Sequence, residues 1–316
     1  MELKHESTFD KKLKAKRRMM MFKKNLPFHL MLLPGVILVI IFCYIPMYGI
    51  VIAFQNFVPA KGLFGDQQWV GLENFRIVFS FPNIWQVIKN TVVISLWKIA
   101  LNTLIPVIIA LLLNEINNKY FKKSVQTIIY FPYFLSWVIF GGILIDVLSP
   151  SSGIVNEIIR ALGFKEIYFL GNEKWFQPTA VITDIFKTFG FSTVVYLATI
   201  AGISPTLYEA AQIDGANRWQ QTWHITLPGM KVIIILLLVL SMGNILNAGF
   251  DQIWNIMNVN VISKADILDT YIYRQGMISR LYGQAAAVGL IKSIVSTIFI
   301  GTSYWIAYKF LDYKLF

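Results

Sequence analysis

The chain has 316 residues, of which 56% are hydrophobic and only 14% are charged, well below the roughly 25% that soluble domains carry. Several apolar runs approach or exceed the ~20 residues that cross a bilayer as a helix, so the composition excludes an ordinary soluble globule and predicts an all-α, polytopic membrane protein. The net charge of +11 would suit a nucleic-acid binder, but nine of the 28 Lys and Arg residues precede Asn25. They have no interleaved aromatic platform, which is typical of a cytoplasmic tail facing anionic lipid and argues against a nucleic-acid partner.

Six apolar runs predict six spanning helices, preceded by a basic tail over residues 1–27 and together forming one membrane domain over residues 28–316. A kink is expected in the first span at its prolines, and the third is expected to break at Gly141-Gly142. The spans are expected at residues 28–54, 88–113, 125–148, 178–203, 231–250 and 285–308.

The segments between the spans are expected to be mostly loops. A short amphipathic helix is predicted over 154–162, and residues 251–284 are expected to form a long loop. The tail, the segments 114–124 and 204–231, and the C-terminus hold 16 Lys and Arg, whereas the other loops hold eight, balanced by eight acids. The positive-inside rule therefore predicts that both termini are cytoplasmic in a multi-pass protein of the cell membrane.

Residues 204–228 form a polar segment with clear helix boundaries between two long apolar runs. Ser204-Pro205 suits the start of a helix, with serine as N-cap and proline at the first helical position. Gly215 is placed to end that helix in a left-handed conformation. Asn217 with Gln220 resembles a variant capping box that opens a second short helix. The prediction is a helix–turn–helix outside the bilayer.

Three groups in this segment, Glu209-Ala210-Ala211, Asp214-Gly215-Ala216 and Ile225-x-Leu227-Pro228, resemble the EAA loop of permease subunits of bacterial ABC importers. In that family the loop is a coupling helix that docks into a groove on the cytoplasmic ATPase subunit. The family often has an aromatic residue where Thr222 stands and a second proline where Val232 stands. An ordinary amphipathic connector is the structural alternative. Within the coupling loop, residues 204–230, the resemblance implies ATPase-coupling roles for Glu209, Ala210, Ala211, Asp214, Gly215, Ala216, Leu227 and Pro228.

Three further stretches resemble the oligo- and polysaccharide branch of the carbohydrate importers: Leu33-Pro34-Gly35, Tyr44 to Gly49 and Val70 to Phe75. This resemblance implies a six-helix permease of the type I importer fold, in the bacterial cell membrane, that passes an oligosaccharide inward. It implies a homologous second permease, two ATPase subunits that bind ATP and Mg²⁺, and an extracellular solute-binding lipoprotein. It implies no catalytic residue and no cofactor in this chain, and the sequence accordingly lacks a phosphate-binding Gly-x-x-x-x-Gly-Lys-Ser/Thr loop.

Two kinds of alternative remain open. Importers of amino acids, peptides or phosphate share the coupling loop, so the loop alone does not name the solute. A multi-span membrane glycosyltransferase would need a carboxylate pair and a basic donor site at one membrane face, and neither is evident. One cysteine, Cys43, and three scattered histidines give no disulfide and no metal-ligand spacing, so no metal site is predicted.

Polar residues inside the spans are the candidates for a substrate pathway, because a charge at the centre of a spanning helix costs about 2.5–3.5 kcal/mol unless it has a partner or a cavity. Asp184 and Lys187, three residues apart, either neutralise each other or line a cavity. Lys98 and Lys292 are expected to pair with acids on a second subunit or to extend toward the membrane surface. Asn244, Asn247 and Asp251, with Trp254 one turn further, are predicted to form one helical stripe facing the sugar or, alternatively, the second permease.

Overall fold

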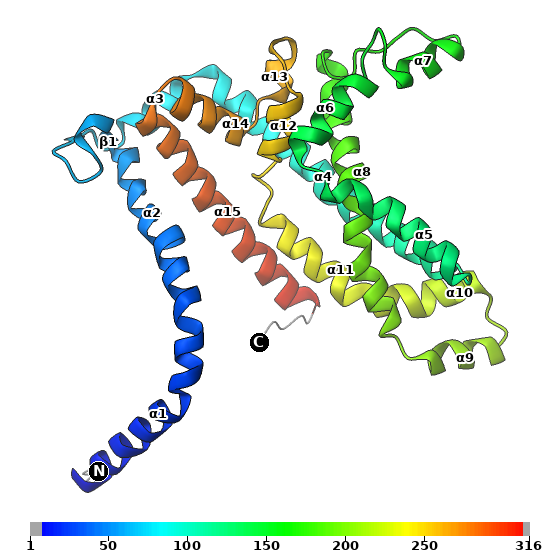
Figure 1. Cartoon of the computed structure of the whole chain (residues 1–316), viewed down its shortest axis with the longest axis horizontal. Coiled ribbons are helices and arrows are strands. Elements are labelled where there is room, and N and C mark those ends of the chain that lie inside the picture. The colour runs from blue at the N-terminus through cyan, green and yellow to red at the C-terminus, as the bar shows by residue number, and fades with distance from the viewer. Residues whose placement is uncertain (1–7, 312–316) are drawn as a thin grey trace. The chain divides into compact units, whose positions relative to one another are not determined.

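The computed structural model describes residues 8–311, which divide after Val51 into two units. The first unit is one long helical segment: α1 (Thr8–Val39), a π-helical turn (Ile40–Tyr44), α2 (Ile45–Met47) and a 3₁₀ helix (Tyr48–Phe54) that runs past the division (Figure 1). A candidate membrane span covers Lys24–Phe54 and contains the predicted first span. α1 continues through residue 27, and the boundary between tail and membrane domain stays a prediction.

Pro46 does not interrupt this helical segment. The Ile45 N–H donates to the Ile40 carbonyl, five residues back, and so forms the π-helical turn just before the proline. The widened turn accommodates a residue that has no N–H of its own, whereas Pro34 of the same candidate span lies inside α1 without such a turn.

The second unit contains four uninterrupted candidate spans: α4 (Pro82–Asn114), α8 (Glu173–Ala201), the helix Arg218–Met242 and α15 (Tyr282–Leu311). Counting the first unit, five described helices are long and apolar enough to cross a bilayer, and a bent pair brings the number to six. The predicted set of six spans is therefore matched in number and order. Several helices start or end a few residues away from the predicted bounds.

The third span is the bent pair, and the expected break at Gly141-Gly142 is wrong. α5 (Lys119–Tyr130), a 3₁₀ helix (Phe131–Phe134) and α6 (Trp137–Val147) are bent by 103°. The break lies at Leu135 and Ser136, between the 3₁₀ helix that contains Pro132 and α6, and the Ser136 hydroxyl caps α6 by accepting from the Ile139 N–H at 3.2 Å. The glycines lie inside α6 instead, where a Cβ on Gly141 would stand 3.2 Å from the side chain of Asn255 in α12.

Residues 251–284 are not a loop but a series of short, largely buried helices. Their apolar side chains, such as Ile253, Val261 and Ile267, join a core with Ile94 of α4 and Phe140 of α6. Sequence periodicity missed them because each is too short to show a period. They are α12 (Phe250–Ile256), a 3₁₀ helix (Val259–Val261), α13 (Ile262–Ala265), α14 (Leu268–Tyr273) and a π-helical turn (Arg274–Ile278).

The remaining elements lie at the two ends of the second unit. The helix predicted over 154–162 is present as α7 (Ile154–Ala161). β1 (Gln55–Asn56) pairs antiparallel with β2 (Gln68–Trp69), and a 3₁₀ helix (Pro59–Lys61) lies between them. α3 (Glu73–Ser80) precedes α4. α9 (Pro205–Ile213) and α10 (Arg218–Gln221) lie at the opposite end from α13 and α14 (Figure 1).

A close approach of α8 to α5 gives the first testable prediction. A Cβ on Gly190 would lie 2.0 Å from the carbonyl oxygen of Ile129, whereas nothing lies within 4 Å of one on Gly142. Gly190→Ala must therefore push the two helices apart and lower the melting temperature of the purified protein by several degrees. Gly142→Ala is the matched control and is expected to leave it unchanged or slightly raised. Equal melting temperatures for the two variants would contradict this packing.

Candidate coupling loop and transport pathway

The first half of the coupling loop folds as predicted. α9 begins with Ser204 at the N-cap position and Pro205 at the first helical position, although the Ser204 hydroxyl bonds the Thr206 hydroxyl at 2.8 Å and does not cap the helix. Gly215 has a φ of +81°, so the predicted left-handed turn is confirmed. The Ala216 N–H donates to the Ala211 carbonyl at 2.8 Å across this turn.

The second half differs from the prediction. The capping box is present, since the side chains of Asn217 and Gln220 each accept from the other's backbone N–H at 2.9 and 2.8 Å. The expected separate short helix is wrong, because α10 continues through a π-helical turn (Thr222–Thr226) into α11 (Leu227–Met242). The Leu227 N–H donates to the Thr222 carbonyl, five residues back. The π-helical turn thus keeps its own hydrogen bond, and the helix continues through Pro228.

The predicted coupling residues lie on the open side of this loop. Glu209, Ala210, Asp214, Gly215 and Pro228 are exposed, whereas the other three are half-buried, namely Ala211, Ala216 and Leu227. The apolar side chain of Ile213 is 87% exposed at the end of α9.

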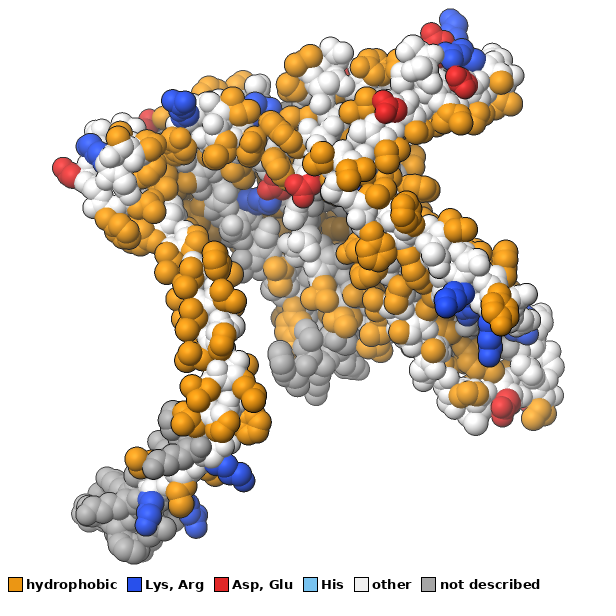
Figure 2. Space-filling view, viewed as in Figure 1, with side chains coloured by type: hydrophobic (Ala, Val, Ile, Leu, Met, Phe, Trp, Pro, Cys, Tyr) orange, Lys and Arg blue, Asp and Glu red, His pale blue; other side chains and the backbone are white. Residues whose placement is uncertain are grey.

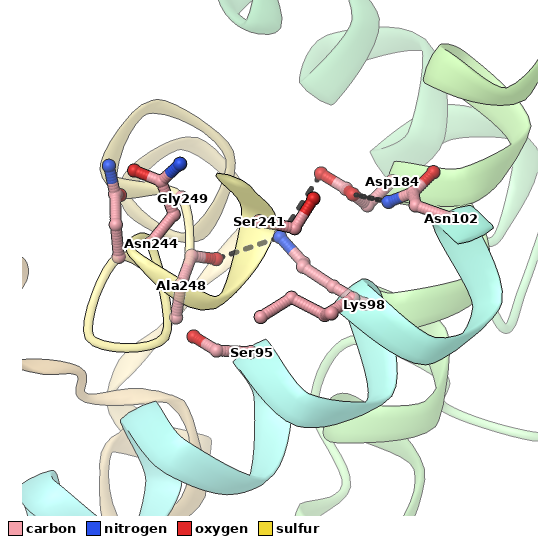
Figure 3. Close-up of a pocket in the computed structure, with 10 residues that line it drawn as sticks. Ser95, Lys98, Asn102, Asp184, Ser241, Asn244, Ala248 and Gly249 are labelled. Atoms are coloured by element: carbon pink, nitrogen blue, oxygen red, sulfur yellow. Dashed lines mark hydrogen bonds and ion pairs between the residues drawn. The ribbon is translucent and has the colours of Figure 1, made fainter. Parts of the chain in front are cut away.

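A polar cavity lies deeper in the bundle, between α4, α8 and the turn that follows α11 (Figure 3). Its centre is the amine of Lys98, which donates to Asp184 Oδ1 at 3.1 Å, to the Ala248 carbonyl at 2.7 Å and to the side chain of Gln252. Asp184 Oδ2 accepts from the Asn102 amide at 3.1 Å. The cavity is lined by Ser95, Lys98, Ile99, Asn102, Asp184, Ser241, Asn244, Asn247, Ala248 and Gly249.

These contacts correct three predicted pairings. Asp184 pairs with Lys98 and not with Lys187, whose amine donates to the Tyr133 carbonyl at 2.9 Å and lies 5.2 Å from the Trp137 ring centroid. Lys98 has its acid within the chain, and so does Lys292 of α15, which pairs with Asp269 of α14. Lys98 and Lys292 therefore need no second subunit for neutralisation, and the Lys187 amine is accommodated by a carbonyl and aromatic rings of its own chain.

The predicted stripe after residue 241 is also corrected. α11 ends at Met242, and Asn244 and Asn247 lie in tight turns whose backbone bonds span three residues. Gly249, with a φ of +94°, turns the chain before α12. Asn244 and Asn247 do line the cavity, but Asp251 does not, and Trp254 packs edge-on against Tyr273 with centroids 4.7 Å apart.

Sequence reasoning overlooked two cavity residues on α4 and a buried glutamine of α12 that lies beside the cavity. Ser95 and Asn102 lie on either side of Lys98 at helical spacing, and Gln252, fully buried, fixes the turn by donating to the Ala180 carbonyl at 2.7 Å. A polar stripe at 95, 98 and 102 was the available signal in an otherwise apolar span. Among residues 8–311 no group of three His, Cys, Asp or Glu side chains could hold a metal ion.

Comparisons with known proteins identify the family. Residues 106–312, which include the whole coupling loop, match the family described as binding-protein-dependent transport system inner membrane component. The chain belongs to this family. It is therefore a multi-pass permease component of a binding-protein-dependent ABC importer, and the predicted fold class is confirmed.

Curated relatives and solved structures cover nearly the whole chain. It is 41% identical to the polygalacturonan/rhamnogalacturonan transport system permease protein YteP of Bacillus subtilis strain 168, over 95% of this chain and 93% of that protein. It is 38% identical to the protein LplB of the same organism, over 93% of this chain and 92% of LplB. A crystal structure of a bacterial ABC transporter involved in the import of the acidic polysaccharide alginate matches with a TM-score of 0.86 and 36% identity, over 93% of this chain and 99% of that one.

The buried ion pair gives the second prediction. Lys98→Met leaves the Asp184 carboxylate buried without its cation, which costs about 3–5 kcal/mol where one partner of a buried pair is removed. The double variant Lys98→Met with Asp184→Leu is expected to recover much of that loss, because no charge then remains. Arg218→Ala, which breaks the exposed pair with Glu115, is the control and costs less than about 1 kcal/mol. Thermal unfolding of the purified variants measures the stability loss of the single variant, the double variant and the control. A double variant less stable than Lys98→Met would contradict the pairing.

Proposed function

We propose that this chain is the permease subunit of an ATP-driven importer for oligosaccharides or polysaccharide fragments. The observation that carries the proposal is the cavity beside Lys98, which the amides of Asn244 and Asn247 and the hydroxyl of Ser241 line between α4, α8 and the turn after α11. Amides and hydroxyls both donate and accept, which suits sugar hydroxyl groups. The printed functions of YteP and of the alginate importer support the same class of solute.

The protons of the Lys98 amine are already donated to three acceptors of the chain itself, so the cavity offers sugars mainly uncharged groups. Asn244 and Asn247 bind the passing sugar in this proposal, and Asp184 contributes a carboxylate edge at the cavity wall. Asp251, Trp254 and Lys187 lie outside the lining of this cavity, and in this proposal they act on neighbouring parts of the pathway.

The coupling loop is the proposed contact with an ATPase subunit. Its exposed residues dock on a partner that binds ATP and Mg²⁺, a homologous second permease completes the pathway, and an extracellular solute-binding lipoprotein delivers the sugar. The solved complex of the alginate importer with a periplasmic protein bound to an alginate pentasaccharide supports the last of these partners. This arrangement places both termini in the cytoplasm.

The coupling role is tested at Gly215. Gly215→Val puts a β-branched side chain at a φ of +81°, and even an unbranched side chain costs about 1–2 kcal/mol in this region. We expect an inserted complex whose sugar uptake falls at least tenfold. Gly215→Asn is the matched control, because asparagine adopts the left-handed region readily, and it is expected to keep most of the uptake. Normal uptake and normal sugar-stimulated ATP hydrolysis in the valine variant would rule out the coupling turn.

The pathway role is tested at Asn247. Asn247→Leu replaces an amide of the cavity with an apolar group of similar size, so uptake of the sugar should fall several-fold or change its selectivity while the complex stays assembled. Asn117→Leu changes an exposed asparagine outside the cavity and serves as the control. Loss of subunit association, with normal transport by the complexes that remain, would instead assign Asn247 to an interface.

Orientation is tested by cysteine labelling in a Cys43→Ala background. Lys123→Cys and Asn217→Cys, both exposed and both on the proposed cytoplasmic side, should react with an impermeant maleimide only after the membrane is opened. Asn260→Cys, exposed at the other end, should react in intact cells. Reaction of the residue-217 cysteine from outside would reverse the orientation and remove the coupling role.

A further inference from the structure

Helix α7 has an exposed apolar face that its own chain leaves uncovered. Three sides of the helix differ in character. One side, with Asn156 fully buried, packs onto the chain, and a second, with Glu157 and Arg160, is polar and exposed. The third is apolar and exposed, at Ile154 (59%), Ile158 (56%) and Leu162 (68%), and Phe164 just beyond the helix is 70% exposed.

The orientation of α7 is fixed by hydrogen bonds, so this exposure is a property of the fold. The Asn156 amide donates to the Ser149 and Ile167 carbonyls, both at 3.0 Å, and accepts from the Ile167 N–H at 2.8 Å. The Arg160 guanidinium donates to the Pro150 carbonyl at 3.1 Å and to that of Ser151 at 3.3 Å. Both side chains thereby tie the helix to the segment that leaves α6.

The position of α7 relates its apolar side to the membrane. It lies between the end of α6 and the start of α8, at the end of the bundle opposite the coupling loop, and extends sideways from it (Figure 1). Hydrophobic side chains line the lower edge of this arm in the view of Figure 2, the edge toward the spans, and most of its charged side chains lie along the upper edge. α8 has 29 residues, about 43 Å at 1.5 Å per residue, so its ends reach beyond both faces of a ~30 Å hydrocarbon layer.

We propose that α7 and Phe164 form an interfacial anchor that lies on the lipid leaflet opposite the coupling loop, with Ile154, Ile158 and Leu162 inserted among the headgroups and upper acyl chains. A short helix with apolar and charged faces lies in the plane of the interface when its apolar face can enter the acyl boundary. The half of α6 that leads to α7 is also apolar and exposed, at Ile143 (44%) and Ile145 (49%), and α6 belongs to a candidate span. Lipid is therefore the occupant that suits both the apolar face of α7 and the candidate span next to it.

The anchor has a consequence for transport that depends on neither the sugar nor the orientation of the chain. It holds the junction between α6 and α8 at a fixed depth, and α8 carries Asp184 of the cavity. The proposed anchor therefore constrains the depth of one end of the helix that carries Asp184.

The experiment uses the importer with its partner subunits, reconstituted in lipid nanodiscs, with a Cys43→Ala permease carrying one nitroxide-labelled cysteine. Ile158→Cys reports the apolar face, and Glu157→Cys, one residue away on the polar face, is the matched control. Collision of each label with oxygen, which concentrates in lipid, is compared with collision with a water-soluble nickel chelate. We expect the ratio of oxygen to nickel accessibility to be at least fivefold higher at 158 than at 157.

Two results would overturn the anchor. Equal, water-like ratios at the two positions would mean that the apolar face is in solvent. Low accessibility to both reagents at 158, restored when the solute-binding protein or the second permease is omitted, would mean that a protein covers the face. Complexes that retain sugar-stimulated ATP hydrolysis after labelling show that neither substitution has disrupted the assembly.

Discussion

The arrangement of the bundle depends on the hydrogen bonds that the ammonium group of Lys98 donates. It lies in a spanning helix where an unpartnered charge is costly, and its three acceptors come from α8, from the turn after α11 and from α12. No single neighbour could satisfy it. Meeting its hydrogen-bonding requirement therefore holds together three elements that are distant in the sequence, and the space left between them is the polar cavity.

The same requirement, that polar groups in lipid find partners within the protein, explains how the prolines are accommodated. π-helical turns precede Pro46 and Pro228, and in each the residue just before the proline donates five residues back. Both helices continue through their prolines, although the sequence predicts a kink at Pro46 and a helix boundary near Pro228. After Pro132 the outcome differs: the helix tightens into a 3₁₀ turn and then breaks, and Ser136 caps the next helix. Pro34 and Pro106 lie inside α1 and α4 with neither a widened turn nor a break.

Sequence reasoning succeeded where the determinants are local. Ser204-Pro205, Gly215 and the Asn217–Gln220 capping box each act within four residues, and the structure shows all of them in the predicted conformations apart from the unused serine cap. Reasoning failed where partners are distant. Lys98 and Asp184 are 86 residues apart, and the adjacent Lys187 offered a nearer, incorrect partner. The buried helices after residue 250 are stabilised by a core contributed by α4, α6 and α8, so their own residues carry little signal.

The cavity and the coupling loop are joined by two helices, which suggests how movement passes between them in the proposed importer. α8 carries Asp184 and ends where the loop begins, and the helix Arg218–Met242 starts within the loop and carries Ser241 at its other end. At 1.5 Å per residue the two stretches measure about 26 and 35 Å. Because α10 is fused to α11, one continuous helix joins the second half of the loop to this side of the cavity. In the proposed importer, a displacement of residues 218–226 is carried along that helix to Ser241 and the turn that follows it. The fusion, which the sequence did not reveal, puts the second half of the loop and Ser241 of the cavity on one helix, whereas α9 is joined to it through the Gly215 turn.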